Sequence, residues 1–176
     1  MTNALAEQSS ALKHDGNNVV RKLMRTDNNI ASTIIRVTLG VVFFAHGAQK
    51  MLGWFGGAGP AGAVKYFAGM RIPKVFAWLA IGAEFFGSLG LIFGLLTRVA
   101  SLGLAANMIV AIAKVHMQFG FFMNWHDEQE GEGIEYHILV LSMIAFLMMQ
   151  GAGAFSLDRR LSGGSRDETN HDDRTI

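Results

Sequence analysis

Ionisable residues interrupt the long apolar stretches of this 176-residue sequence near one end of each stretch. The group consists of His46, Lys50, Glu84, Lys114, His116, Glu135 and His137. A charged side chain at the centre of a membrane costs about 2.5–3.5 kcal/mol even on lenient scales, so such residues usually form pairs, bind ligands or carry protons. Carboxylate, ammonium and imidazole groups suit proton exchange and hydrogen bonding to a small polar molecule. The pattern predicts a polar site inside a membrane protein.

The composition restricts the chemistry of that site. Hydrophobic residues make up 51% of the chain and charged residues only 16%, and the formal net charge of +1 gives no argument for nucleic-acid binding. Cysteine is absent, which excludes a thiol nucleophile, a disulfide relay and a cysteine-ligated iron–sulfur cluster. No zinc or calcium ligand spacing occurs, and we predict no metal site. Any redox chemistry must therefore come from a bound cofactor or from a partner.

Four apolar runs predict the fold. They cover residues 30–52, 75–96, 99–122 and 136–155. Each can span about 30 Å of hydrocarbon at about 1.5 Å per residue, and none has the alternation of a barrel strand. We therefore expect an all-α integral membrane protein, a four-helix bundle. The first link, residues 53–74, contains GWFGGAGPAGA and predicts a glycine-rich outer loop between helices 1 and 2.

The polar ends and the basic residues set the expected boundaries and orientation. Residues 1–29 are expected to form a flexible cytoplasmic tail, residues 30–158 the transmembrane domain, and residues 159–176 a disordered tail. Basic residues that flank the spans on one side are Arg21, Lys22, Arg25, Arg98, Arg159 and Arg160. By the positive-inside rule this side is cytoplasmic, so both termini are predicted to lie there. All Trp and Tyr residues fall at the opposite, outer boundary, which hints at a site built there.

Counting along the helices places the candidate residues in the outer half. His46 lies about 24 Å from the inner end of the first helix and Lys50 one turn further. Glu84 is the deepest charged group, with Asn107 near the midplane. We expect Glu84, His46 and His116 to face the interior and to meet in one cavity. In a purely structural alternative, Glu84 only forms a hydrogen bond or an ion pair with a neighbour such as Lys114.

Arg36 stands apart from this group. It falls toward the inner face, where it could act as a structural anchor or pair with Asp158. Haem bound between His46 and either His116 or His137 remains an open alternative, because those histidines share a similar depth.

Several sequence segments resemble the DoxX family of membrane proteins (DoxX/DoxD-like). They are RVTLGVVFFAHGAQKMLGWFGGAG at 36–59, AEFFGSLGLIFGLLTRVASLGLAANM at 83–108, GEGIEYHILVLSMIAF at 131–146 and GAGAFSLD at 151–158. The resemblance covers about residues 30–161. It implies a multi-pass four-helix bundle in the bacterial plasma membrane, associated with quinol oxidase or thiosulfate:quinone oxidoreductase. The matched polar positions and one glycine are Arg36, His46, Gly47, Lys50, Glu84, Arg98 and Glu135.

Two hypotheses follow for the function. In the first, the chain is a membrane oxidoreductase subunit coupled to quinone, with Glu84 and His46 as catalytic residues. Its cofactor-binding residues would be Lys50, His116, Glu135, Asn107 and Arg36, with Phe43, Phe44, Phe85 and Phe86 flanking the ring. In the alternative, the chain is a non-catalytic subunit that docks or stabilises a partner redox enzyme. Contact with the lipid bilayer is expected in both, and homo-oligomerisation stays open.

Overall fold

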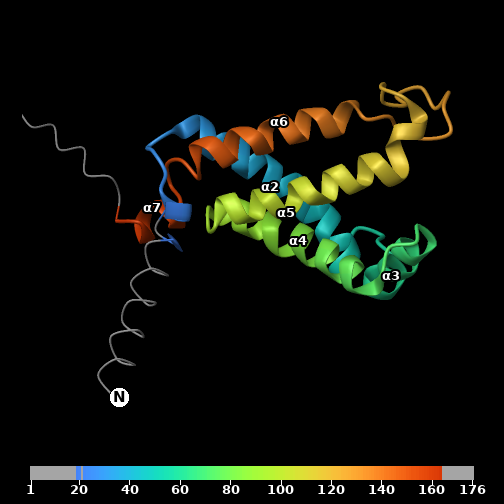
Figure 1. Ribbon diagram of the computed structural model, residues 1–176, viewed down its shortest axis with the longest axis horizontal. Helices are drawn as coiled ribbons and strands as arrows, with labels where there is room; N and C mark the ends of the chain where they lie inside the picture. The colour runs from blue at the N-terminus through green and yellow to red at the C-terminus, as the bar shows by residue number, and fades with distance from the viewer. Residues whose placement is uncertain (1–18, 21, 164–176) are drawn as a thin grey trace, which may run out of the picture.

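The computed structural model describes residues 19–20 and 22–163, and in that part the regular elements are all helices, with no strand. The helices are α2 (Ile30–Met51), α3 (Gly59–Gly69), α4 (Lys74–Phe93), α5 (Thr97–Ala111), a π-helical turn η1 (Ile112–His116), a 3-10 turn η2 (Met117–Phe119), α6 (Glu135–Gln150) and α7 (Leu157–Leu161) (Figure 1). The predictions for residues 1–18, 21 and 164–176 lie outside the described residues.

Three helical segments are long and apolar enough to cross a membrane: Ile30–Met51, Lys74–Phe93 and Thr97–Phe119. The predicted all-helical membrane class is therefore confirmed. Helix α6 is apolar but only 16 residues long, or about 24 Å, which is less than the hydrocarbon thickness of about 30 Å. The predicted fourth run continued to residue 155, but the helix ends at Gln150 because Gly151 and Gly153 have positive φ angles and turn the chain.

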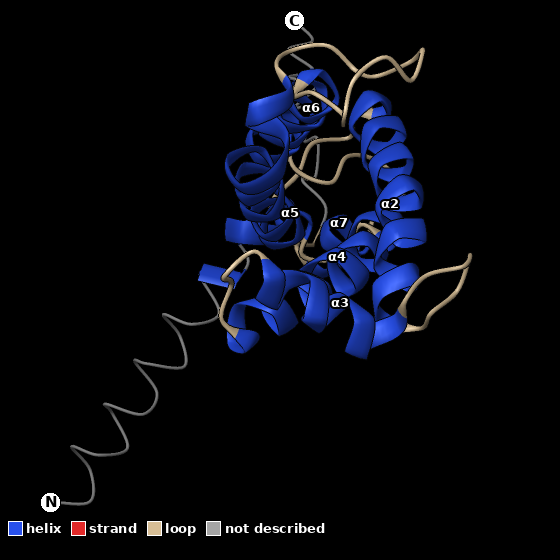
Figure 2. Cartoon of the chain, turned by 90° about the vertical axis from the view of Figure 1, so that its right-hand side faces the viewer, coloured by secondary structure: helices blue, strands red, loops and turns tan. Residues whose placement is uncertain are grey.

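The helices pack in chain order, with α2 against α4, α4 against α5 and α5 against α6 (Figure 1). Seen from the end where α3 lies, α5 and α6 stand on one side and α2 on the other (Figure 2). The buried apolar core takes residues from all four of these helices: Leu39, Phe43, Leu91, Leu104, Met108, Val140, Ile144 and Leu147. Large apolar side chains also point outward, as in Ile34, Leu79, Leu102 and Leu139, each about three-fifths exposed. These outward residues form the surface that meets lipid.

The link between α2 and α4 is only partly a loop. Gly53 and Gly56 turn the chain with positive φ angles, and α3 then begins at Gly59 with Pro60 in its first turn, a favoured position for proline. The prediction of a glycine-rich loop over all of residues 53–74 is thus not confirmed. Most glycines of this link fall before residue 60, and residues 59–69 form α3. We call this end of the molecule, the predicted outer end, the α3 end.

At the opposite end, Arg36 is 1% exposed and ties three segments together. Its five N–H groups donate to five backbone carbonyls, those of Leu91, Ile92, Ala152, Ala154 and Phe155, at 2.6–3.3 Å. Helix ends leave carbonyls without partners, and a planar guanidinium can satisfy several of them at once. We call this end, the predicted inner end, the α7 end.

Asp158 has a different partner from the one predicted. Its two carboxylate oxygens accept from Leu96 N at 2.7 Å and from Thr97 N at 2.9 Å, so that it caps the first turn of α5. The predicted pairing of Arg36 with Asp158 is wrong, because backbone groups at the helix ends occupy both side chains. Thr26 also binds here, accepting from Gly153 N at 2.7 Å, which anchors the segment before α2.

Candidate functional site

One ion pair joins α2 to α4 toward the α3 end, and it is the only one within residues 19–20 and 22–163. Lys50 Nζ lies 2.8 Å from Glu84 Oε2. The Glu84 side chain is 9% exposed and that of Lys50 is 30% exposed. The carboxylate is therefore buried while the ammonium can still be reached from outside. A buried ion pair often adds nothing to stability compared with apolar residues, so its presence in a membrane span favours a functional role.

A glycine contact explains why these two side chains meet. A Cβ atom built on Gly47 would lie 2.7 Å from Phe85 Cα, 2.8 Å from Phe85 N and 3.0 Å from the carbonyl carbon of Glu84. The backbones of α2 and α4 therefore touch at Gly47, as small residues permit in membrane helices. Lys50 lies one turn further along α2 on the same face, where its side chain reaches Glu84.

Replacing Gly47 with alanine is therefore expected to push α2 away from α4 and to separate Lys50 from Glu84. The added methyl group meets backbone atoms that cannot rotate away, and overpacking of this kind costs about 1–3 kcal/mol. The matched control is Gly82→Ala on α4, where a Cβ would meet nothing within 4 Å. Thermal unfolding in detergent should show a lower midpoint for Gly47→Ala only. Equal midpoints for the two variants would contradict the contact.

Aromatic rings pair between α2 and α4 and with the segment that follows α2. The ring centroids of Phe44 and Phe85 are 5.8 Å apart, and Trp54 stands edge-on to Phe44 at 6.4 Å. Of the four phenylalanines predicted to flank a ligand, Phe44 and Phe85 pair with each other between α2 and α4. Phe43 instead packs in the core at 1% exposure, and Phe86 is 62% exposed. The Phe44–Phe85 pair thus joins the same two helices as the ion pair does.

Tyr136, at the start of α6, is a site residue that the sequence reasoning missed. Its phenol lies close enough to Glu84 for the carboxylate charge to act on it. Its ring packs against the core and stands edge-on to the His137 ring at 5.5 Å. The signal was present in the sequence, because all Trp and Tyr residues fall at this boundary, but it did not single out one residue.

The histidines and Glu135 form a second cluster. The His116 and His137 rings lie 4.1 Å apart, and His137 is 5% exposed with no partner for Nδ1 in the described part of the chain. His116 Nδ1 lies 2.8 Å from the carbonyl oxygen of Glu132, and Glu135 accepts from Met123 N at 3.2 Å. These contacts hold the loop of residues 120–134 to the helices. The structure thus divides the predicted cavity into two clusters, with Tyr136 next to both.

The remaining predicted residues fall elsewhere. His46 is exposed, so the prediction that it faces the interior is wrong; the buried stripe of α2 runs through Leu39, Phe43 and Gly47, and His46 lies beside it. Asn107 donates to the carbonyl of Ala80 at 2.9 Å and ties α5 to α4. Arg36 lies at the α7 end with all its donors engaged.

Two further alternatives can be compared with the structure. The alternative that Glu84 pairs with a neighbouring residue is confirmed, but the partner is Lys50; Lys114 is exposed and forms no ion pair among the described residues. No group of three or more His, Asp or Glu side chains suited to a metal occurs in residues 19–20 and 22–163. Binding of haem stays an untested prediction.

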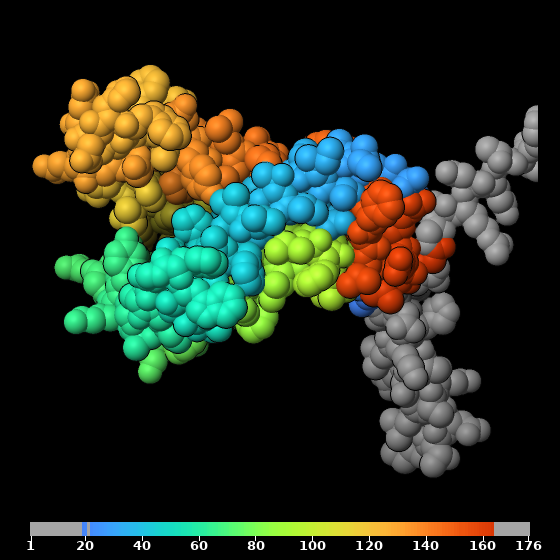
Figure 3. All heavy atoms as spheres, turned by 180° about the vertical axis from the view of Figure 1, so that it is seen from behind, coloured from blue at the N-terminus to red at the C-terminus, as the bar shows by residue number. Residues whose placement is uncertain are grey.

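The molecular surface is hollowed at the α3 end. Figure 3 shows the hollow between the loop of residues 120–134, in gold, and α3, in green, with the nearby part of α2 along its border. Lys50 belongs to the last turn of α2.

Comparisons with known proteins agree with this picture. The DoxX family model matches residues 31–117. A Bacillus subtilis protein named "Putative oxidoreductase CatD" is 27% identical over 135 residues, covering 77% of this chain and 90% of its own length. "Inner membrane protein YqjF" of Escherichia coli is 27% identical over 139 residues, covering 79% of this chain and 98% of its own.

A Haemophilus influenzae relative, named only as an uncharacterized protein, is 30% identical over 140 residues, covering 78% of this chain and 87% of its own length. No solved structure matches the chain significantly. The matched region includes the ion pair, the Gly47 contact and Arg36. The chain belongs to the DoxX family of membrane proteins.

Proposed function

We propose that this chain is a membrane subunit of a quinone-linked oxidoreductase and that the Lys50–Glu84 pair binds the quinone head group. The observation that carries the proposal is the 2.8 Å ion pair, in which the Glu84 side chain is buried and the Lys50 side chain is 30% exposed. One relative has a name that describes it as an oxidoreductase, which supports the reaction class.

The side chains present fit a quinone head group. Such a group has two carbonyl oxygens that accept hydrogen bonds and a flat ring that packs on aromatic side chains. The ammonium of Lys50 has three donors, of which one suffices for Glu84, so others remain for a carbonyl oxygen. Phe44 and Phe85 would offer ring faces from the same two helices that carry the pair.

The ligand would supply the redox chemistry, and side chains of the protein would supply proton transfer and orientation. A bound quinone supplies two-electron redox chemistry. Glu84 would take a proton from, or return one to, the ligand oxygen, which is general acid–base catalysis by a positioned carboxyl group. Lys50 would orient that oxygen and balance the charge of Glu84. Because the sequence contains no cysteine, the electrons would have to come from a partner protein or from a second small molecule.

The proposed topology places this site in the outer leaflet. Helix α6 would be the fourth span, shortened by the turn at Gly151, so that the bundle has four spans with both termini on the inner side. Arg98 supports the α7 end as the inner end, since it donates to four backbone carbonyls there. A relative named as an inner membrane protein supports the plasma membrane as the location.

A second candidate function is a non-catalytic subunit that docks or stabilises a redox enzyme. The loop of residues 120–134 favours it, because Phe121, Phe122 and Trp125 are 50%, 67% and 80% exposed there. In that case the ion pair would serve only to hold α2 against α4.

Lipid extraction from gently purified protein tests the proposal. The wild type should retain about one quinone per chain, and Lys50→Met should retain several-fold less because the donor to the carbonyl oxygen is gone. Lys65→Met, which removes an exposed lysine on α3, is the matched control. A visible spectrum of the same sample tests for haem. Absence of quinone from the wild type, or equal amounts in all three proteins, would count against the proposal.

A further inference from the structure

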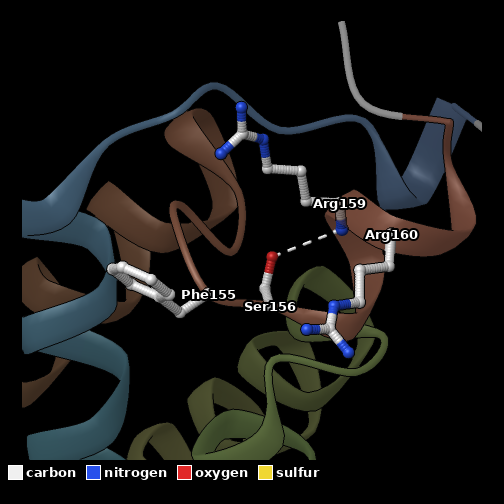
Figure 4. Close-up of a pocket in the computed structure, with 4 residues that line it drawn as sticks. All are labelled: Phe155, Ser156, Arg159 and Arg160. Atoms are coloured by element: carbon white, nitrogen blue, oxygen red, sulfur yellow. Dashed lines mark hydrogen bonds between the residues drawn. The ribbon is translucent and has the colours of Figure 1, made fainter.

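We propose that the α7 end carries a binding site for the phosphate of an anionic phospholipid. The site is an open pocket of about 360 Å³, lined by Phe155, Ser156, Arg159 and Arg160 (Figure 4). It lies at the opposite end of the molecule from the Lys50–Glu84 pair and does not depend on the proposed function.

The two arginines give the pocket an unbalanced positive charge. Arg160 is exposed, and its side chain has no hydrogen bond or ion pair with any described residue. Arg159 donates from Nη1 to Asn28 Oδ1, which leaves its other N–H groups available. The neighbouring carboxylate of Asp158 is 1% exposed and occupied by the amides of Leu96 and Thr97. Guanidinium groups match phosphate oxygens in geometry and charge, so an anionic phosphate fits this pocket.

The pocket is also apolar on one side. Phe155 is 83% exposed, and Figure 4 shows its ring beside α2, with the two arginine side chains on opposite sides of Ser156. Leu157 and Leu161 on α7 are 38% and 61% exposed. A phospholipid has the same arrangement, with an apolar glycerol and acyl region followed by a charged phosphate. The joint presence of an exposed aromatic ring and two arginines therefore favours a lipid over a free anion.

The walls of the pocket are held in place. Phe155 has a positive φ of 52°, an uncommon conformation for a residue with a large side chain, and its carbonyl accepts from Arg36 at 2.7 Å. Ser156 accepts from Arg159 N at 3.3 Å and donates to the carbonyl of Gly153 at 2.8 Å. The ring and the start of α7 are thus fixed before any ligand binds, which lowers the entropy cost of binding.

Native mass spectrometry of the detergent-purified full chain tests this site. With added phosphatidylglycerol, the wild type should retain one lipid per chain, about tenfold more than with phosphatidylcholine. The variant Arg159→Gln/Arg160→Gln should lose this preference, and Arg160→Gln alone should weaken it several-fold without a change in thermal midpoint. Phe155→Ser should weaken retention of both lipids.

The matched control is Lys65→Gln/Lys74→Gln, which removes the same charge from exposed positions near the α3 end. It should retain phosphatidylglycerol as the wild type does. Equal loss in this control would mean that lipid follows net charge and would overturn the site. Unchanged retention in Arg159→Gln/Arg160→Gln would also overturn it. Full displacement of the lipid by millimolar inorganic phosphate would show a site for free phosphate instead.

Discussion

Replacing Arg36 with leucine is expected to prevent the protein from accumulating as a folded membrane protein. The substitution removes five hydrogen bonds at the α7 end. It leaves the carbonyl oxygens of Ile92, Ala152 and Phe155 with no other donor among the described residues, whereas those of Leu91 and Ala154 still accept from Gly94 N and Thr33 Oγ1. Each buried group left unsatisfied costs about 1–3 kcal/mol, so the three orphaned carbonyls together cost about 3–9 kcal/mol. That is comparable with the whole stability of a typical domain, about 5–15 kcal/mol.

The measurement is the yield of monodisperse protein after detergent extraction, together with its thermal midpoint. Arg36→Lys should give an intermediate result, because an ammonium has three donors instead of five. Arg25→Leu is the matched control, since Arg25 lies at the same end and is exposed, and it should change stability by about 0.5 kcal/mol or less. If Arg36→Leu matched Arg25→Leu in yield and midpoint, the role of the buried guanidinium would be wrong.

Replacing Glu84 with glutamine is expected to abolish quinone-linked turnover while the protein still accumulates. Glutamine has nearly the same shape and can still accept a hydrogen bond from Lys50, but it cannot take up a proton. Loss of a positioned general acid or base lowers rates by about 100-fold or more. The measurement is reduction of a short-chain benzoquinone by membranes that contain the protein and its cellular partners, normalised to protein amount.

The same variant separates the two candidate functions. If the chain is a docking subunit and the ion pair only stabilises it, Glu84→Gln should lower abundance and leave the rate per protein unchanged. Glu128→Gln is the control, because Glu128 is exposed in the loop of residues 120–134 and should change neither quantity. An unchanged rate for Glu84→Gln at normal abundance would refute the catalytic role.

The sequence predicts the spans better than it predicts their ends. The runs 30–52 and 75–96 correspond closely to α2 and α4, because long uninterrupted apolar stretches allow few other structures in a membrane. The fourth run was extended to residue 155, whereas Ala152 and Ala154 turn out to be buried under the helix ends. Hydropathy does not distinguish an alanine buried in protein from an alanine in lipid.

The sequence predicts how far along each helix the site residues lie, but not how each helix is rotated about its axis. Counting residues placed Glu84, Lys50 and His46 in the same half of the bundle, and Glu84 was identified as the deepest charge. An ion pair with a neighbour was one alternative for Glu84, with Lys114 as the example, whereas the structure pairs it with Lys50. The choice depends on the backbone contact between Gly47 and Phe85, which fixes how α2 is rotated against α4 and which turns His46 outward. A single sequence contains no measure of that rotation.

Arg36 shows that the hydrogen-bond partners of a buried side chain are also difficult to predict from sequence. Its inner position and structural role follow from its place in the first span, but a charged partner, Asp158, was expected. The structure gives it carbonyl oxygens, which become available only where α4 ends and where the chain turns after α6. Those acceptors depend on where helices stop, which the sequence predicts least well.

Photoaffinity labelling with an azido-benzoquinone tests the central claim most directly, because it reports where a quinone head group lies. Labelled peptides are mapped by mass spectrometry in the wild type and in Lys50→Met. We predict adducts on the α3-end halves of α2 and α4, near Phe44 and Phe85, that fall several-fold in Lys50→Met and disappear with excess unlabelled quinone. Adducts confined to other helices, or unchanged by Lys50→Met, would contradict the assignment of the Lys50–Glu84 pair as the quinone site.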